Sequence, residues 1–177
     1  MLIDKVKELS VINEDLKASR QAIVDIFISK RMMLCKDFEI FFAKKDFEVA
    51  FNGEICCLNA KYHDLRFVLE YDRKVIENDE NLNFWFYSTG LIKEEFPRFE
   101  MVLYHPPYGK LPDLPELANS TLDNKLAKMK AEISINHQKI EILKGNDWNL
   151  KIRSSQHSGD YDTIFEFLRK YFEETVE

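Results

Sequence analysis

Proline and glycine are scarce in this chain of 177 residues, with five of each. The first glycine is Gly53 and the first proline is Pro97. Because these two residues interrupt helices and strands, their absence predicts long, uninterrupted elements in the first third of the chain. Disorder is excluded as well, since 45% of the residues are apolar and 13% are aromatic, which is enough to form a core.

Cysteine is also rare, and its pattern argues against a disulfide framework. The three cysteines are Cys35, Cys56 and Cys57, an odd number with two of them adjacent. This usage is typical of reduced thiols in the cytoplasm, which is the location we expect. Charged residues alternate with aliphatic ones over the first 20 positions, so no signal peptide is expected. No apolar run is long enough to cross a bilayer, and no membrane partner is expected.

The motifs that bind metals and cofactors are missing. There is no glycine-rich phosphate-binding motif, and Cys56-Cys57 lacks the two-residue gap of a zinc knuckle. The four histidines are scattered along the chain at His63, His105, His137 and His157. We therefore expect no metal site, no cofactor and no catalytic residues that follow a known motif.

The net charge of −6 is concentrated in the middle of the chain. Residues 37–109 carry eight Lys and Arg against fourteen Asp and Glu, whereas residues 1–36 carry seven against five. An acidic middle argues against nucleic acid as a partner, because cationic side chains supply most of the affinity for phosphates. It would suit a basic partner surface or simply keep the protein in solution.

A heptad pattern opens the chain and predicts an N-terminal helix over residues 1–34. Apolar residues recur every seven positions, and a second set with Asn13 and Arg20 occupies the intervening heptad position. The first set is Leu2, Leu9, Leu16 and Ile23, and the second is Val6, Asn13, Arg20 and Phe27. Two interpretations stay open: a surface helix that packs on the same chain, and a coiled coil that joins two copies into a homodimer.

The period changes to two between residues 38 and 105, which predicts a β-meander. The expected strands are "FEIFFAK", "FEVAFNG", "EICCLNAKY", "DLRFVLEY", "LNFWFYS" and "RFEMVLYH", and Asn52-Gly53 between two of them is a hairpin signal. The proline-rich "HPPYGKLPDLP" then ends the sheet.

A second long helix is expected over residues 113–144. Asp113 and Glu116 have the spacing of a capping box, and "KGN" ends the heptad pattern. "DWNLKIRS" reads as a further strand, and Thr163 with Glu166 predicts the start of a short C-terminal helix within residues 147–177. The sequence thus predicts one α+β domain over residues 1–177, with an antiparallel sheet of about five to seven strands, two long amphipathic helices and a short one.

The run "LNFWFYS" places four aromatic residues side by side and separates the two faces of the sheet. In a strand, neighbouring side chains point to opposite faces. Phe84 and Phe86 therefore share the apolar face of the neighbouring strands, while Trp85 and Tyr87 share a mixed polar and aromatic face. That second face is too polar for a sealed core, and covering by the C-terminal helix is one explanation for it.

A docking surface for another protein is a second explanation, because Trp and Tyr are enriched at interfaces, and the function that we predict rests on it. The residues expected to bind the partner are Trp85, Tyr87, Tyr104, Arg66, Glu70 and Glu100. The predicted function is a non-enzymatic protein-binding module, such as a small microbial inhibitor, immunity or adaptor protein with an acidic, aromatic sheet face. A small-molecule binder that uses a cleft on the sheet is an alternative.

An enzyme is the other alternative, as a divergent metal-dependent nuclease or another hydrolase. Asp46, Glu54 and Lys61 loosely resemble the core of restriction-type nucleases, although Asn59 stands where that core has an acid. "SSQHSGDYD" also contains Ser, His and Asp, but neighbours on one short loop rarely form a triad. A polar loop before a capped helix explains these residues equally well.

Overall fold

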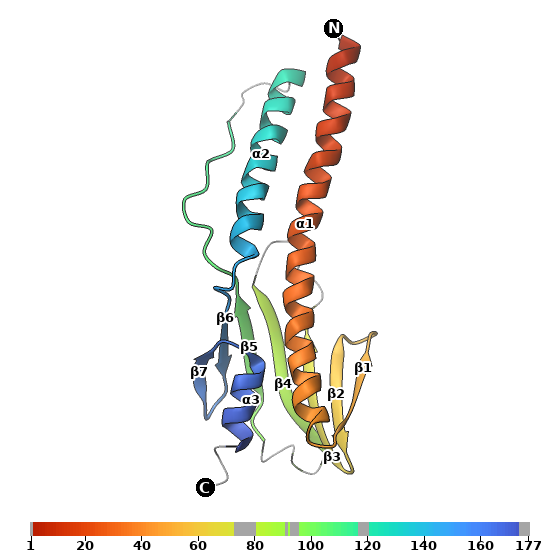
Figure 1. Cartoon of the computed structure of the whole chain (residues 1–177), viewed down its shortest axis with the longest axis vertical. Helices are drawn as coiled ribbons and strands as arrows, with labels where there is room; N and C mark the ends of the chain where they lie inside the picture. The colour runs from red at the N-terminus through yellow and green to blue at the C-terminus, as the bar shows by residue number, and fades with distance from the viewer. Residues whose placement is uncertain (1, 73–80, 91, 93–95, 117–120, 174–177) are drawn as a thin grey trace. The chain divides into compact units, whose positions relative to one another are not determined.

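The computed structural model describes residues 2–72, 81–90, 92, 96–116 and 121–173. Within these residues it has three helices and a seven-stranded sheet (Figure 1). The elements are α1 (Leu2–Ala43), β1 (Glu48–Asn52), β2 (Cys57–Tyr62), β3 (Leu65–Tyr71), β4 (Leu82–Gly90), β5 (Phe99–Tyr104), α2 (Leu122–Leu143), β6 (Asn149–Arg153), β7 (Ser158–Tyr161) and α3 (Ile164–Glu173). The predicted α+β class is confirmed. Across the described ranges, no helix combines the length and apolar character that a membrane span requires.

The chain forms two compact units. The first comprises Met1–Ile26 and Pro106–Asn146, and the second comprises Phe27–His105 and Asp147–Glu177. Helix α1 contributes its N-terminal part to the first unit and its C-terminal part to the second. The expectation of a single domain over the whole chain stays a prediction.

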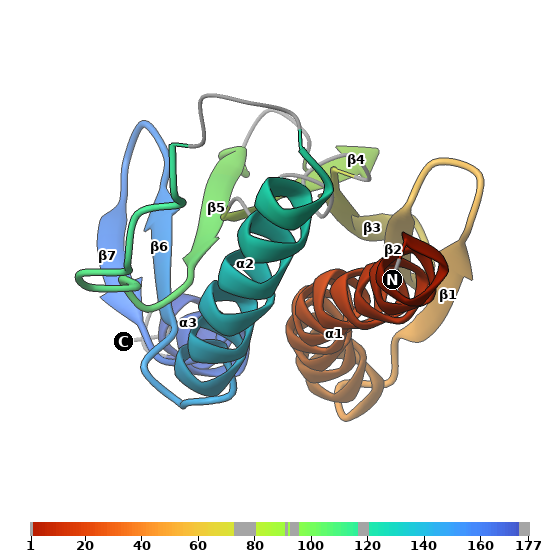
Figure 2. The ribbon, with the colours of Figure 1, turned by 90° about the horizontal axis from the view of Figure 1, so that it is seen from above.

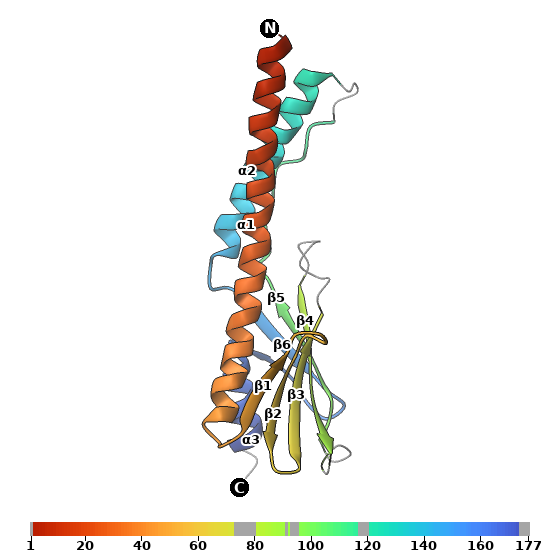
Figure 3. The same ribbon diagram turned by 90° about the vertical axis from the view of Figure 1, so that its right-hand side faces the viewer.

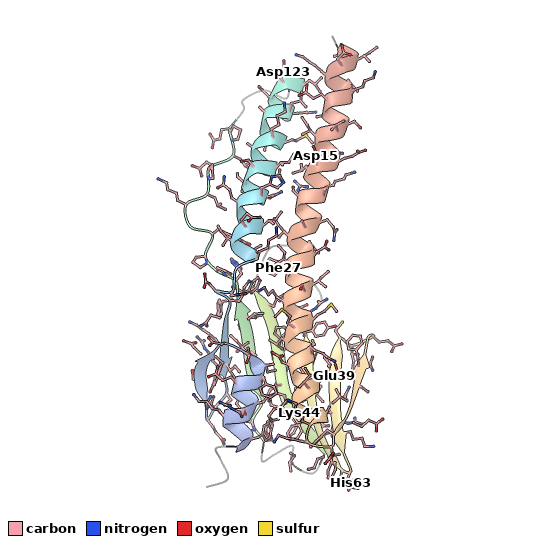
Figure 4. The ribbon with its side chains drawn as sticks, viewed as in Figure 1. Asp15, Phe27, Glu39, Lys44, His63 and Asp123 are labelled. Carbon is pink, nitrogen blue, oxygen red and sulfur yellow. The ribbon has the colours of Figure 1, made fainter. Side chains whose placement is uncertain are left out.

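In the first unit, α1 and α2 lie side by side and run in the same direction (Figures 1 and 3). Ser19 of α1 hydrogen-bonds Asn136 of α2, 117 positions further along the chain. Ion pairs flank this seam where Glu8 meets Lys130 and Arg20 meets Glu132. Figure 4 labels Asp123 in the first turn of α2, where its carboxylate accepts a hydrogen bond from Lys5 at 2.8 Å. These side-chain contacts join α1 and α2 as a parallel pair of helices.

The buried stripe of α1 agrees with the predicted one only in part. Leu16, Ile23 and Phe27 are buried as expected, whereas Leu2 is 72% exposed. Ile12 and Ser19 are buried in place of the next residue in each case. Asn13 and Arg20 are exposed, as is Val6 at 53% of its surface. The partner that covers the stripe is α2, so the stripe no longer requires a homodimer, which stays a prediction.

The Ser19–Asn136 pair yields a first prediction, because it is a buried hydrogen bond between α1 and α2. Asn136 Nδ2 donates to Ser19 Oγ at 2.9 Å, and Ser19 Oγ donates to the Leu16 carbonyl at 2.9 Å. We expect Asn136→Ala to lower the free energy of unfolding by about 1–2 kcal/mol, since a buried hydroxyl loses its donor. Urea unfolding followed by helical circular dichroism measures it. Asn13→Ala is the matched control on an exposed position, and equal effects of both would contradict the prediction.

In the second unit, the sheet is a meander with strand order β1-β2-β3-β4-β5-β6-β7, every neighbouring pair being antiparallel (Figure 2). The predicted meander is confirmed, and the Asn52-Gly53 hairpin joins β1 and β2 as expected. The C-terminal part of α1 and helix α3 lie on one face of the sheet (Figure 3). Strand β7 was not predicted, because "SGDY" is short and has no apolar alternation.

The predicted strand "FEIFFAK" is wrong, because α1 continues through it to Ala43. Leu34, Phe38, Phe41 and Phe42 are all buried and follow the spacing of a helix face. No glycine or proline interrupts the helix before this point. The chain leaves the helix in the turn that contains Asp46, whose φ is 63°.

The predicted start of α2 at Asp113 and Glu116 is also wrong. Residues 106–116 form neither helix nor strand, and α2 begins at Leu122. Its N-cap is Thr121, whose hydroxyl oxygen accepts the backbone N–H of Asn124. One half of the predicted capping box of α3 is present, since the Thr163 side chain accepts the Glu166 backbone N–H at 3.1 Å. The Glu166 carboxylate accepts the backbone N–H of Asp162 instead of that of Thr163.

Phenylalanine dominates the core between the sheet and its helices. Phe86 lies at the centre with no exposed surface, and the rings of seven other phenylalanines lie within 6.4 Å of its ring centroid. They are Phe38, Phe42, Phe67, Phe96, Phe99, Phe167 and Phe172. The core face is therefore sealed around Phe86, and the partly exposed side chains of β4 lie on the opposite face.

Cys35 yields a second prediction, on thiol reactivity. Burial raises the pKa of this thiol from 9.0 to about 11, although the Arg31 guanidinium acts in the opposite direction. At pH 8 the folded protein should hold about a hundredfold less Cys35 thiolate than the unfolded chain, so iodoacetamide should label Cys35 slowly. The raised pKa also contributes stability below about pH 9 that is lost as the pH rises towards 11. Mass spectrometry of folded and urea-unfolded protein tests this, and equal labelling rates at pH 8 would rule it out.

Candidate functional site

The sheet has a second face, which the core helices do not cover, and we call it the aromatic face because it carries Trp85, Tyr87 and Tyr104. Along β4 the burial alternates strictly: Leu82, Phe84, Phe86 and Ser88 are buried, and the residues between them are partly exposed. This pleat turns Trp85 and Tyr87 away from Phe84 and Phe86, as predicted. Both aromatic side chains are half-buried, and so is Tyr104 on β5.

Strand register places four of the six predicted binding residues in a continuous row or beside it. Trp85 lies directly opposite Glu70 of β3 on one side and Glu100 of β5 on the other. Tyr87 lies one pleat further along β4 and donates a hydrogen bond to Glu70 Oε2 at 3.1 Å. Tyr104 lies four residues beyond Glu100 on β5, about 13 Å away.

Arg66 lies apart from this group at the other end of β3. It faces Thr89 across the strand pair and Lys61 on the other side. Four residues separate it from Glu70, which is about 13 Å along the strand. Arg66 and Tyr104 therefore mark opposite ends of the aromatic face rather than members of one cluster.

Three cations of the aromatic face were missed by the sequence reasoning. The Arg98 guanidinium lies 6.0 Å from the Trp85 ring and 5.4 Å from the Tyr87 ring. Lys151 of β6 lies 5.3 Å from the Tyr104 ring, and Arg153 lies opposite Glu100. Each of the three aromatic rings thus has a cation at a distance suited to cation–π attraction. The face is less acidic than the charge balance of residues 37–109 suggests.

Two hollows lie among these side chains. The larger, of about 470 Å³, is shallow and open to solvent, and its lining is Trp85, Arg98, Glu100, Arg153 and Ser154. The smaller, of about 130 Å³, is lined by Glu100, Val102, Tyr104, Lys151 and Arg153. They share Glu100 and Arg153, so the two hollows form one uneven strip across β4, β5 and β6.

Tyr87 is held in its protonated form. Burial raises the pKa of its phenol, and the charge of Glu70 together with the hydrogen bond to Glu70 raises it further, while Arg98 acts in the opposite direction. A phenol with a raised pKa is a hydrogen-bond donor throughout the physiological range. Tyr87 therefore fixes the Glu70 carboxylate beside Trp85.

The residues of the nuclease alternative do not converge. Glu54 lies in the turn between β1 and β2, where its backbone N–H donates to Asn52 Oδ1. Lys61 is near the far end of β2, about 13 Å from the start of that strand. It lies opposite Glu48 of β1 in the strand register. Asp46 is an exposed residue of the turn after α1. Within the described ranges, no three His, Cys, Asp or Glu side chains gather closely enough to hold a metal ion.

The "SSQHSGDYD" segment forms the β6–β7 hairpin and does not assemble a triad. Ser154 Oγ accepts the backbone N–H of His157 at 2.9 Å and does not contact its ring. The His157 ring lies near the Phe99 ring and contacts the Tyr161 hydroxyl on the core side of the sheet. Asp160 lies opposite Lys151 in the strand register, on the other side of the sheet. His63 is likewise a turn residue, between β2 and β3 (Figure 4).

No protein-family model matches this chain, and no curated protein or solved structure is significantly similar to it.

Proposed function

We propose that this protein is a non-enzymatic protein-binding module that docks its partner on the aromatic face. The observation that carries the proposal is the set of half-exposed aromatic rings, each with a cation nearby: Arg98 at Trp85 and Tyr87, and Lys151 at Tyr104. Trp, Tyr and Arg are the residue types that dominate binding energy at protein interfaces. They carry rigid apolar surface and a polar group together, so they remain compatible with water before the partner binds.

The mixed charge of the face favours a protein over a nucleic acid, because carboxylates as well as a cation lie beside Trp85. Trp85 is flanked on both neighbouring strands by carboxylates, Glu70 and Glu100. A base stacked on Trp85 would bring its phosphates towards these two acids, which is unfavourable. A protein surface of mixed charge can pair with Glu100 and Arg153 at the same time.

The shape of the face favours a protein over a small molecule. Small-molecule sites bury most of the ligand surface. The larger hollow is shallow and open, and the smaller one holds only about 130 Å³. A flat strip with two depressions is better suited to side chains that project from a partner. An inhibitor, an immunity protein or an adaptor would use such a strip, and the three free thiols support a cytoplasmic location as part of this proposal.

Site-specific photo-crosslinking tests the proposal in cells that make the protein naturally. A benzophenone amino acid replaces Asn149 or Arg66, which are exposed residues at the two ends of the aromatic face. Glu54, in the β1–β2 turn, is the control position. We expect both face positions to yield the same cross-linked protein and the control to yield none. Absence of a product from both face positions, or the same product from Glu54, would refute the proposal.

A further inference from the structure

Helices α1 and α2 of the first unit leave one flank open, and this flank is a groove of about 700 Å³. Its floor is apolar and consists of Leu9 and Leu16 of α1 with Met129 of α2. Val6 extends the apolar surface towards the start of α1, and Arg20 closes the other end. From Val6 to Arg20 is fourteen residues, so the groove runs for about 21 Å along α1.

The groove lies beside the part of the α1 heptad pattern that α2 does not cover. Leu9 and Leu16 are on the side of α1 that faces α2, and both also line the groove. Val6, Asn13 and Arg20 form the row beside them and are exposed. The exposed Val6 and the partly exposed Leu9 therefore leave apolar surface on α1 that α2 does not cover.

The rim of the groove on the α2 side is cationic. Lys125 and Lys128 are both exposed, and neither forms an ion pair within the described part of the chain. On the α1 side, the charge of Arg20 is already matched by Glu132 of α2. The groove thus combines an apolar floor with two unmatched positive charges along one edge.

We propose that this groove binds an amphipathic helix of another protein whose flank is acidic. Apolar side chains of that helix would cover Val6, Leu9 and Met129, and its Glu or Asp residues would pair with Lys125 and Lys128. Helix-in-groove binding uses this combination of apolar anchors and flanking charges. The result is a three-helix bundle in the first unit, formed at a surface distinct from the aromatic face.

A second copy of the chain fits the groove less well than an acidic helix. A two-fold dimer places the same patch of both subunits face to face. That interface would contain Lys125 and Lys128 of both copies, and such an accumulation of positive charge is unfavourable. The charge of the groove therefore selects a partner of opposite sign.

A display selection tests the proposal with a library of helices as the probe. The library presents helices of about 21 residues with fixed apolar a and d positions and with Glu, Lys or Gln at the e and g positions. We expect selection on the full-length protein to enrich Glu over Lys by about tenfold at the positions that flank the apolar stripe. We expect the variant Val6→Arg, which places a bulky charge in the groove, to retain no helices.

Charge reversal provides the matched comparison. Lys125→Glu with Lys128→Glu should reverse the preference from Glu to Lys in the selected helices. Lys7→Glu with Lys110→Glu makes the same charge change outside the groove and should keep the preference for Glu. Circular dichroism confirms that every variant keeps its helices.

Three results would overturn the proposal: no charge preference in the selection, the same preference after reversal at Lys125 and Lys128, or helices that bind Val6→Arg as well as the unchanged protein. Sedimentation adds a fourth. If the protein is a dimer and Val6→Arg dissociates it, the occupant of the groove is a second copy.

Discussion

Phe86→Ala should lower the free energy of unfolding by about 3–5 kcal/mol, the cost of removing a large buried ring from a packed core. Phe86 has no exposed surface and stands at the centre of the phenylalanine cluster between the sheet and the helices. Its ring contacts β3 through Phe67, β5 through Phe99 and α3 through Phe167. The cavity would therefore open where these elements meet, and no single side chain is placed to fill it.

Phe51→Ala is the matched control, because it makes the same chemical change on the same sheet. Phe51 lies on the edge strand β1 and is 60% exposed. Its loss should change the free energy of unfolding by less than about 1 kcal/mol. Urea unfolding followed by near-ultraviolet circular dichroism measures both variants. A loss below about 1 kcal/mol for Phe86→Ala would show that the cluster is not the core of the second unit.

The alternation of side chains between the faces of the sheet could be predicted from the sequence, because the pleat has a fixed period of two. Phe84 and Phe86 are buried and Trp85 and Tyr87 are partly exposed, as the run "LNFWFYS" indicates. The same periodicity and the turn signals predicted six strands of the meander, β1 to β6. The segment "FEIFFAK" was predicted as a strand as well, but it lies in α1. That segment fits both periods, since Phe38 and Phe42 are four residues apart. The helix prevailed because Leu34 and Phe41 complete a helical stripe on the core.

The charged part of the aromatic face could not be predicted in the same way. Lys151 and Arg153 come from β6, which pairs with β5 after an excursion of more than forty residues along the chain. Nothing in local periodicity indicates which strand lies beside β5, because that pairing depends on the fold as a whole. Arg98 precedes β5 and reaches back over β4. The aromatic residues were visible in the sequence, but their cations became visible only in three dimensions.

Trp85→Ala should weaken binding of the partner by at least about 2 kcal/mol, which is roughly a thirtyfold rise in Kd. Trp85 lies at the centre of the face, between Glu70 and Glu100 and beside Arg98. Central aromatic residues surrounded by polar groups are the ones that carry most of the binding energy at interfaces. The partner for this measurement is the protein that cross-links to positions 149 and 66.

The same substitution should cost little stability, and this contrast with Phe86 separates a binding residue from a core residue. Trp85 is only half-buried. Its replacement by Ala removes the attraction between its ring and Arg98, which is worth about 0.5–1 kcal/mol at an exposed site. Tyr62→Ala is the matched control for binding, because Tyr62 is an exposed aromatic residue on the opposite side of the sheet. The Kd of this variant for the partner should equal that of the unchanged protein. If Trp85→Ala destabilises the fold as severely as Phe86→Ala, Trp85 belongs to a second core. If it leaves both stability and Kd unchanged, the partner docks elsewhere and the aromatic face is not its binding site.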